Sequence, residues 1–161
     1  MTSSKDGSNA YYRAATSVDP HQVRSITVEW AVPVDAAVPG IDRARLISTL
    51  EAAIFREVKA LPQKIGGHPV IIRAAITRVE SVSPALNVLT SVFLTVPLDR
   101  GGTAVEIQVL DAETLQPLAS MAHAYYVPIS EFKARFSAFA PAELALHAAA
   151  GELAKLLREN S

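Results

Sequence analysis

The chain lacks cysteine, and this absence excludes several kinds of chemistry. Among its 161 residues there is no Cys, and there are only 2 Met and 1 Trp. Disulfides, thiol catalysis and cysteine-based zinc sites are therefore excluded, while the compartment stays open. A length of 161 residues suits one hydrophobic core better than two, so a single domain is expected.

Charge and long hydrophobic runs are also scarce. The formal net charge is −1, so no basic surface for nucleic acid or for an anionic membrane is indicated. No apolar run approaches the roughly 18 residues that a membrane-spanning helix needs. The hydrophobic fraction of 50% excludes an intrinsically disordered chain. Alanine supplies about a third of that fraction and buries little area, which makes the effective core thinner.

The first ten residues, MTSSKDGSNA, are polar and have no period. We expect residues 1–10 to form a disordered lead and residues 11–161 to form a single domain. The lead is not a signal peptide, because no basic region is followed by an apolar stretch. Two explanations stay open: a cytosolic protein with a loose tail, or a segment whose export signal was removed and whose lead tethers the domain to a membrane anchor.

Alternating hydrophobicity predicts five strands, at 24–32, 69–79, 88–96, 103–110 and 118–127. Helical spacing predicts a helix at about 42–60 with Asp42 as its N-cap, and a last helix at about 142–158 with Pro141 in its first turn. The element order is β-α-β-β-β-β-α. We therefore expect an α+β fold with a five-stranded, mostly antiparallel sheet, a central strand at 88–96, one parallel crossover and the helices packed on one face.

The sequence contains no assembled catalytic, cofactor or metal motif. Its four histidines have no partner histidine at helical spacing, and no G-x-S-x-G occurs. The pairs Gly66-Gly67 and Gly101-Gly102 do not open a P-loop, so loop or hairpin use is expected for both. We accordingly predict no catalytic residue, no cofactor and no metal.

Four polar residues are still candidates for a site. His123 shares a strand face with Met121 and Tyr125 and is interpreted first as a partly buried strand histidine. The enzymatic alternative pairs His123 with Glu106 or Asp111, which adjacent strands could bring within hydrogen-bond reach. Asp111, together with Thr114, is interpreted first as structural, because both side chains can bond the backbone of their turn.

Aromatic residues are the candidates for an interaction surface. Ser130 can cap a helix that carries Phe132, Phe136 and Phe139 at i, i+4 and i+7. Such a stripe is usually core, and its alternative is a docking surface for a partner or a lipid-like ligand. Tyr11 and Tyr12 precede the first expected strand and either cover a sheet edge or belong to an arm that orders on binding.

Several short motifs follow one another in an order that is hard to obtain by chance. They are Ala-Ile-Thr-Arg-Val at 75–79, Pro-Ala-Leu-Asn at 84–87, Gly-Gly-Thr-Ala-Val-Glu at 101–106, Asp-Ala-Glu-Thr at 111–114 and Pro-Leu-Ala at 117–119. With Val-Asp-Pro at 18–20, this series resembles a bacterial lipoprotein family of unknown function, domain of unknown function three-three-one-three. The resemblance spans roughly Tyr11 to Lys155. It implies an exported lipoprotein-type domain, anchored in the periplasm or outer membrane through an upstream lipidated cysteine.

The chain departs from that family after Thr114, where it has Leu115-Gln116 in place of Gly-Glu. Because leucine does not tolerate a positive φ at low cost, a different turn type is expected there.

Three functional hypotheses remain. The first is a non-catalytic envelope domain that binds a protein partner or an envelope component, with homo-oligomerisation through an exposed edge strand left open. The second is a carrier of a small apolar ligand, held in a pocket between helices and sheet. The third is the enzyme built on His123. Nucleic acid is not expected as a partner, and a membrane is expected only through the lipid anchor.

Overall fold

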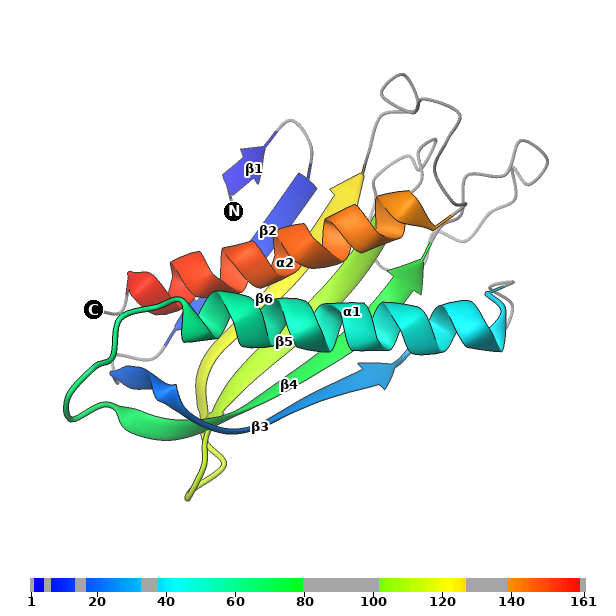
Figure 1. Ribbon diagram of the computed structural model, residues 1–161. Coiled ribbons are helices and arrows are strands. Elements are labelled where there is room, and N and C mark those ends of the chain that lie inside the picture. Colours follow the sequence, from blue (N-terminus) through cyan, green and yellow to red (C-terminus); the bar gives the residue numbers. More distant parts are fainter. Residues whose placement is uncertain are drawn as a thin grey trace.

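The computed structural model describes residues 2–4, 7–13, 17–32, 38–79, 102–126 and 139–159. These residues form one sheet and two helices (Figure 1). The elements follow the chain in the order β1 (Thr2–Ser4), β2 (Gly7–Arg13), β3 (Val18–Trp30), α1 (Gly40–Lys59), β4 (His68–Val79), β5 (Gly102–Asp111), β6 (Pro117–Tyr126) and α2 (Ala140–Arg158). The predicted α+β class is confirmed.

The sheet has the strand order β1-β2-β6-β5-β4-β3. Strands β3 and β4 run parallel, and all other neighbours in the sheet run antiparallel. Helix α1 connects β3 to β4, because parallel neighbours need a crossover and cannot be joined by a tight hairpin. The prediction of one parallel crossover in a mostly antiparallel sheet is therefore confirmed.

Both helices lie on the same face of the sheet (Figure 1). Helix α1 packs against β3 and α2, while α2 packs against β5 and β6. The core lies between these two layers, because alternate strand residues point toward the helices and are fully buried. Leu46, Leu50 and Ile54 of α1, for example, are 0% exposed, as are Ile72 and Ile76 of β4.

Helix α2 explains why alanine is so common in this chain. Ala142, Ala145, Ala149 and Ala150 are each 0% exposed, so they are core residues despite their size. Small side chains at a contact let helix axes approach more closely than leucine would. Helix α2 therefore contributes to the core through several small buried side chains.

The N-terminal segment differs from the disordered lead that the sequence predicts. Its residues Thr2–Ser4 and Gly7–Arg13 form strands, and β2 pairs with β6 from Gly7 opposite Tyr125 to Arg13 opposite Ala119. The expected boundary at residue 10 therefore falls inside a strand. Main-chain hydrogen bonds do not need an alternating apolar pattern, and without β2 the edge of β6 would be unpaired.

The strand count also differs from the prediction. Four expected strands correspond to β3, β4, β5 and β6, and the expected strand at 88–96 lies outside the described residues. Strand β4 pairs directly with β5. With β1 and β2 included, the described sheet has six strands, where the sequence predicts five.

The helix starts are displaced from the predictions by a few residues. Helix α1 begins at Gly40, and Asp42 lies in its first turn without capping it through a side-chain hydrogen bond. The Asp42 carboxylate instead pairs with Arg45 at 3.2 Å and favours the positive end of the helix dipole. Helix α2 begins at Ala140 with Pro141 in its first turn, as predicted.

Gly66 and Gly67 serve the loop between α1 and β4, which is the predicted use of this pair. Gly66 has a φ of 80°, a conformation that glycine adopts without steric cost. A Cβ atom on Gly67 would lie 2.5 Å from the backbone nitrogen of Asp19. The loop and the start of β3 therefore touch at a point where only glycine fits.

Candidate functional site

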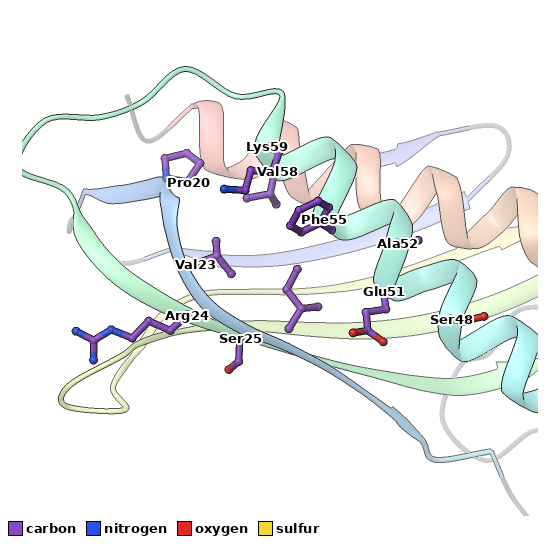
Figure 2. A pocket seen from close by; sticks show the side chains of 11 residues that line it. Pro20, Val23, Arg24, Ser25, Ser48, Glu51, Ala52, Phe55, Val58 and Lys59 are labelled. Carbon is purple, nitrogen blue, oxygen red and sulfur yellow. The ribbon is translucent and has the colours of Figure 1, made fainter.

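A groove opens between α1 and the edge strand β3 (Figure 2). Its volume is about 440 Å³, within the range of ligand-binding clefts. Strand β3 provides one wall and α1 the other, and the lining residues are Pro20, Val23, Arg24, Ser25, Ile26, Ser48, Glu51, Ala52, Phe55, Val58 and Lys59. The groove is thus built from two elements that are adjacent in sequence.

The interior of the groove is apolar. Val23 and Ile26 of β3 are half-buried against the core, and Val58 of α1 is buried. Phe55 projects from α1 into this space and remains 55% exposed (Figure 2). A phenylalanine left half in water beside other apolar side chains is typical of a contact surface and is not needed for the core.

Charged side chains lie on the rim of the groove. Arg24 is 57% exposed and makes a long 3.6 Å contact with Glu113. The Lys59 ammonium lies 5.8 Å from the centre of the Phe55 ring, within cation–π range. Glu51 provides the opposite charge on the α1 side. The rim therefore carries two cations and one anion around an apolar interior.

The groove runs beside an open backbone edge. Strand β3 pairs with β4 from Val18 to Trp30, and among the described residues no strand pairs with its other edge. Trp30 at the far end of β3 is half-buried, and the Arg43 guanidinium lies 5.3 Å from its ring centre. An edge strand of 13 residues next to an apolar groove can accept a further polypeptide strand.

The end of the groove nearest the α1–β4 loop is fixed by Asp19, which is 1% exposed. The Asp19 carboxylate accepts hydrogen bonds from the backbone N–H of His21 and from the Gln22 amide, each at 2.9 Å. The backbone N–H of Lys64 donates to it at 3.4 Å. Burial raises the pKa of Asp19, but these hydrogen bonds outweigh burial and hold the pKa below 3.8.

The His21 ring adds a second tie between β3 and α1. Its Nε2 lies 2.8 Å from the carbonyl oxygen of Leu61, and the nitrogen must donate because a carbonyl can only accept. Together with Asp19, this bond anchors the start of β3 to the loop that follows α1. These hydrogen bonds close one end of the groove.

His123 lies away from the groove, on the helix-covered face of β6, and is 5% exposed. Its ring stacks on Tyr125 with centroids 6.2 Å apart. Burial lowers the pKa of His123; nearby Glu152 raises it and Lys155 lowers it, so that the pKa lies below 6.5. The sequence predicts a partly buried strand histidine among aromatic residues, and the structure buries His123 almost completely beside Tyr125.

The structure does not bring His123 to either expected acid. Glu106 is opposite Ala122 and exposed, so its side chain leaves the other face of the sheet. Asp111 lies six residues beyond Val105, the partner of His123, which is about 20 Å along the strand. The acid whose charge acts on His123 is Glu152 of α2, which raises the pKa of His123. The sequence alone did not point to Glu152.

Asp111 organises the turn between β5 and β6. Its carboxylate accepts the backbone N–H groups of Thr114 and Glu113, each at 2.9 Å, and His68 Nδ1 donates to it at 2.7 Å. These bonds lower the pKa of Asp111 well below 3.8, and burial opposes them only partly. The backbone N–H of Gln116 donates to the Thr114 hydroxyl at 3.4 Å.

The expected change of turn type at Leu115 is wrong. Leu115 has a φ of 58°, the left-handed conformation that glycine favours. Its N–H donates to the Asp111 carbonyl at 2.9 Å, and the Asp111 N–H donates to the carbonyl of Gln116. These bonds, with those of the Asp111 side chain, hold a leucine in a conformation that it rarely adopts.

The aromatic residues that the sequence singles out lie in different parts of the chain. Phe139 precedes α2, is 8% exposed and belongs to the core. Phe132 and Phe136 lie outside the described residues. Tyr11 and Tyr12 lie on β2, opposite Met121 and Ser120, so their segment covers the edge of β6. No cluster of three or more metal-ligating side chains occurs in the described ranges, and neither described helix is long and apolar enough to cross a membrane.

Sequence reasoning missed the groove. Phe55 lies outside the buried stripe of α1, because it follows the buried Ile54 directly and therefore points in a different direction. That offset was readable in the sequence as an unpaired apolar residue on the polar face. The packing of α1 against the outer strand β3 could not be predicted from the sequence, because it depends on the order of all strands in the sheet.

The comparisons with known proteins give no match at the level of sequence families. No protein-family profile matches the chain, and no curated protein matches it significantly.

Solved structures match the fold. Protein XCC0632 from Xanthomonas campestris, of the family DUF330, has a TM-score of 0.51 and 14% identity over 90% of this chain and 91% of its own. A PelC variant from Paraburkholderia phytofirmans, which forms a dodecamer, has a TM-score of 0.50 and 9% identity over 91% of this chain and 96% of its own. At these identities the likeness establishes the fold alone. The chain has the α+β fold of the DUF330 protein XCC0632 and of PelC.

Proposed function

We propose that this protein is a non-catalytic domain of the bacterial cell envelope that binds a protein partner at the groove between α1 and β3. The observation that carries the proposal is the half-exposed Phe55 in an apolar groove that adjoins the open edge of β3. Half-exposed aromatic side chains in a well-formed pocket are typical centres of protein–protein contacts. The candidate acid–base residues do not converge, which supports binding over catalysis.

The envelope location rests on the resemblance of the motifs between residues 75 and 119 to a bacterial lipoprotein family. The proposed anchor is a lipid on a cysteine upstream of this segment, in the periplasm or at the outer membrane. Reading the gene upstream of Met1 and fractionating the native host test this location. An export signal with a lipidation cysteine is expected, and a chain recovered in the cytosol contradicts it.

Self-association is part of the proposal. A PelC variant with the same fold forms a dodecamer. An open strand edge such as that of β3 is a common place for copies of a chain to meet. A second copy of this chain is therefore the alternative to a different protein partner at the edge of β3.

Affinity purification from envelopes of the native host tests partner binding at the groove. The baits are the wild type, Phe55→Ser in the groove and Ile65→Ser as the matched control, since Ile65 is a 99% exposed apolar residue outside the groove. We expect a partner that survives Ile65→Ser and binds Phe55→Ser about tenfold more weakly, or about 1.4 kcal/mol. Equal recovery by all three baits contradicts the proposal.

Transport of a small apolar ligand is the second candidate function, and the volume of the groove favours it. The space of about 440 Å³ with apolar walls could hold such a ligand. Native mass spectrometry of the purified protein tests this: a co-purified adduct that is lost in Phe55→Ser is expected. Finding no adduct on the wild type rejects the carrier and leaves the protein-binding proposal.

A further inference from the structure

The proposed function leaves open what kind of polypeptide enters the groove. Building on that function, we propose that the occupant is an extended peptide segment that adds to the open edge of β3 as a new strand. Alternate side chains of this segment enter the groove, one of them bulky and apolar, and an acidic side chain lies beside Arg24 and Lys59.

The backbone of β3 supports strand addition. Residues Ser25 to Trp30 are in continuous register with Ile71 to Ile76 of β4, which uses the main-chain groups on one side of β3, and an irregularity separates them from Val23. In a strand the N–H and C=O groups point alternately to both sides, so the groups on the other side are available to a new strand. Among the described residues no strand takes them up.

The side chains of the groove fit the spacing of an added strand. A new strand would lie about 4.8 Å from β3, which places it between β3 and the Phe55 side of α1. Half of its side chains would then meet Ile26, Phe55 and Val58, and the other half would leave the opposite face of the sheet. A helix that flanks an open strand edge is the arrangement in which β-augmentation obtains affinity from the backbone and specificity from a pocket.

The charges of the rim favour an acidic segment. Arg24 is 57% exposed, and its contact with Glu113 is long, so its guanidinium can accept a second carboxylate. The Lys59 ammonium lies 5.8 Å from the centre of the Phe55 ring and adds a second cation on the α1 wall of the groove (Figure 2). Glu51 on the other side of the rim disfavours an acid there. Position within the segment, and not charge alone, therefore decides recognition.

An extended peptide accounts for the site better than the other occupants. A small apolar molecule would fill the groove but would leave the backbone edge of β3 and the Arg24 guanidinium unused. A second copy of this chain would need an acidic–apolar extended segment free to pair, and the described edge at the other end of the sheet is β1, Thr2–Ser4, which has neither an acid nor a bulky apolar residue. These two occupants are outcomes of the test.

A yeast-displayed library tests the chemistry of the occupant. The library displays seven-residue segments in which threonine alternates with randomised positions. It is sorted in separate experiments for binding to the wild-type protein, to Phe55→Ser and to Arg24→Glu. Wild type is expected to enrich segments with one aromatic or branched apolar residue and one acid. Phe55→Ser is expected to lose at least tenfold in affinity, and Arg24→Glu to reverse the charge preference. Ile65→Ser should enrich the same segments as wild type.

Hydrogen exchange with an enriched peptide tests the geometry. Strand addition predicts at least tenfold slower exchange at the amides of Ile26, Val28 and Trp30, which point away from β4. Two peptides are N-methylated at alternate residues, one at the odd and one at the even positions. Their affinities should differ, because only one of the two sets of N–H groups faces β3. Binding without protection of β3, or equal loss in both phases, overturns strand addition.

The remaining outcomes separate this inference from the proposed function. A captured partner protein that needs Phe55 but leaves β3 unprotected rejects strand addition and keeps the proposed function. Protection of β3 when the protein alone is concentrated identifies a second copy as the occupant and overturns the peptide. Absence of both an enriched segment and a Phe55-dependent partner overturns both.

Discussion

At the turn between β5 and β6, Leu115 holds a backbone conformation that an L-residue does not favour. Leu115 keeps a φ of 58° because Asp111 and the neighbouring backbone bond the turn from several sides. A left-handed conformation costs an L-residue about 1–2 kcal/mol, and glycine avoids this cost. Replacing Leu115 with glycine removes that cost, but about 0.5–1 kcal/mol of the gain in stability is lost, because glycine loses more conformational freedom on folding.

The first prediction follows from this turn. Leu115→Gly should raise the free energy of unfolding by up to about 1 kcal/mol, measured by urea denaturation. Leu144 is the matched control, since it is also an exposed leucine, at 55%, but lies in α2. Leu144→Gly should lower the free energy of unfolding by about 1 kcal/mol. Destabilisation by both substitutions would show that Leu115 is not strained.

The second prediction concerns the contact between the α1–β4 loop and β3. Gly67→Ala should destabilise the fold by about 1–3 kcal/mol, because the new Cβ meets the backbone of Asp19 at 2.5 Å. Gly151 lies inside α2 with nothing within 4 Å of an added Cβ, so Gly151→Ala should stabilise by about 0.5–1 kcal/mol. Thermal denaturation followed by circular dichroism compares the two variants. Equal effects on the two melting temperatures would refute the close contact.

The third prediction is a two-step loss of stability in acid. The folded pKa of His123 lies below 6.5, so the unfolded chain binds more protons and stability falls as the pH drops below about 6.5. Asp19 and Asp111 have folded pKa values below 3.8, so their contribution is lost only as the pH falls below about 3.8. Urea midpoints at a series of pH values show both steps.

Substitutions assign the two acid steps. His123→Gln should flatten the first step and leave the second. Asp111→Asn should leave the first step and reduce the second to the contribution of Asp19. A first step that persists in His123→Gln would mean that another group is responsible.

At the scale of elements, α1 divides its two faces between the core and the groove. Ile54 is 0% exposed and Phe55 is 55% exposed, although they are neighbours in sequence. The helical period of the leucines and isoleucines predicted the buried face correctly, because that face depends only on spacing along one element. The role of the other face depends on which strand lies beside it, and spacing does not contain this information.

The fourth prediction uses these neighbours in α1. Ile54→Ala should lower the free energy of unfolding by about 2–5 kcal/mol, since it creates a cavity in the core. Phe55→Ala should change it by about 0.5 kcal/mol or less, because a half-exposed side chain contributes little packing. Denaturation of both variants in urea measures the difference. A large loss in Phe55→Ala would place this residue in the core and remove its proposed role in binding.

At the scale of the whole molecule, the class and the crossover were predictable and the sheet edges were not. Alternation in β4, β5 and β6 and the helical period of α1 reflect burial, which leaves a pattern in the sequence. The polar strands β1 and β2 are held by main-chain pairing, which leaves no such pattern. The position of β3 at the open edge, and hence the groove, follows from the complete strand order.

The fifth prediction concerns assembly. If copies of the chain meet at the edge of β3, light scattering during size-exclusion chromatography should give a mass that is a multiple of 17.2 kDa. The Ala31 N–H donates to Ile76 of β4, so by alternation the Val28 N–H points to the open edge. Val28→Pro removes that donor and should shift the mass toward the monomer. Circular dichroism checks that the variant folds. A wild type that stays monomeric at high concentration contradicts self-association through β3.

The most direct test of the central claim is covalent capture at the groove. A photocrosslinking amino acid is placed at position 55 and, as the control, at position 65, and the protein is irradiated in the native host. The account predicts a discrete adduct with a protein, or with a second copy of the chain, at position 55 and its absence at position 65. No adduct at position 55, or the same adducts at both positions, would contradict a partner-binding groove between α1 and β3.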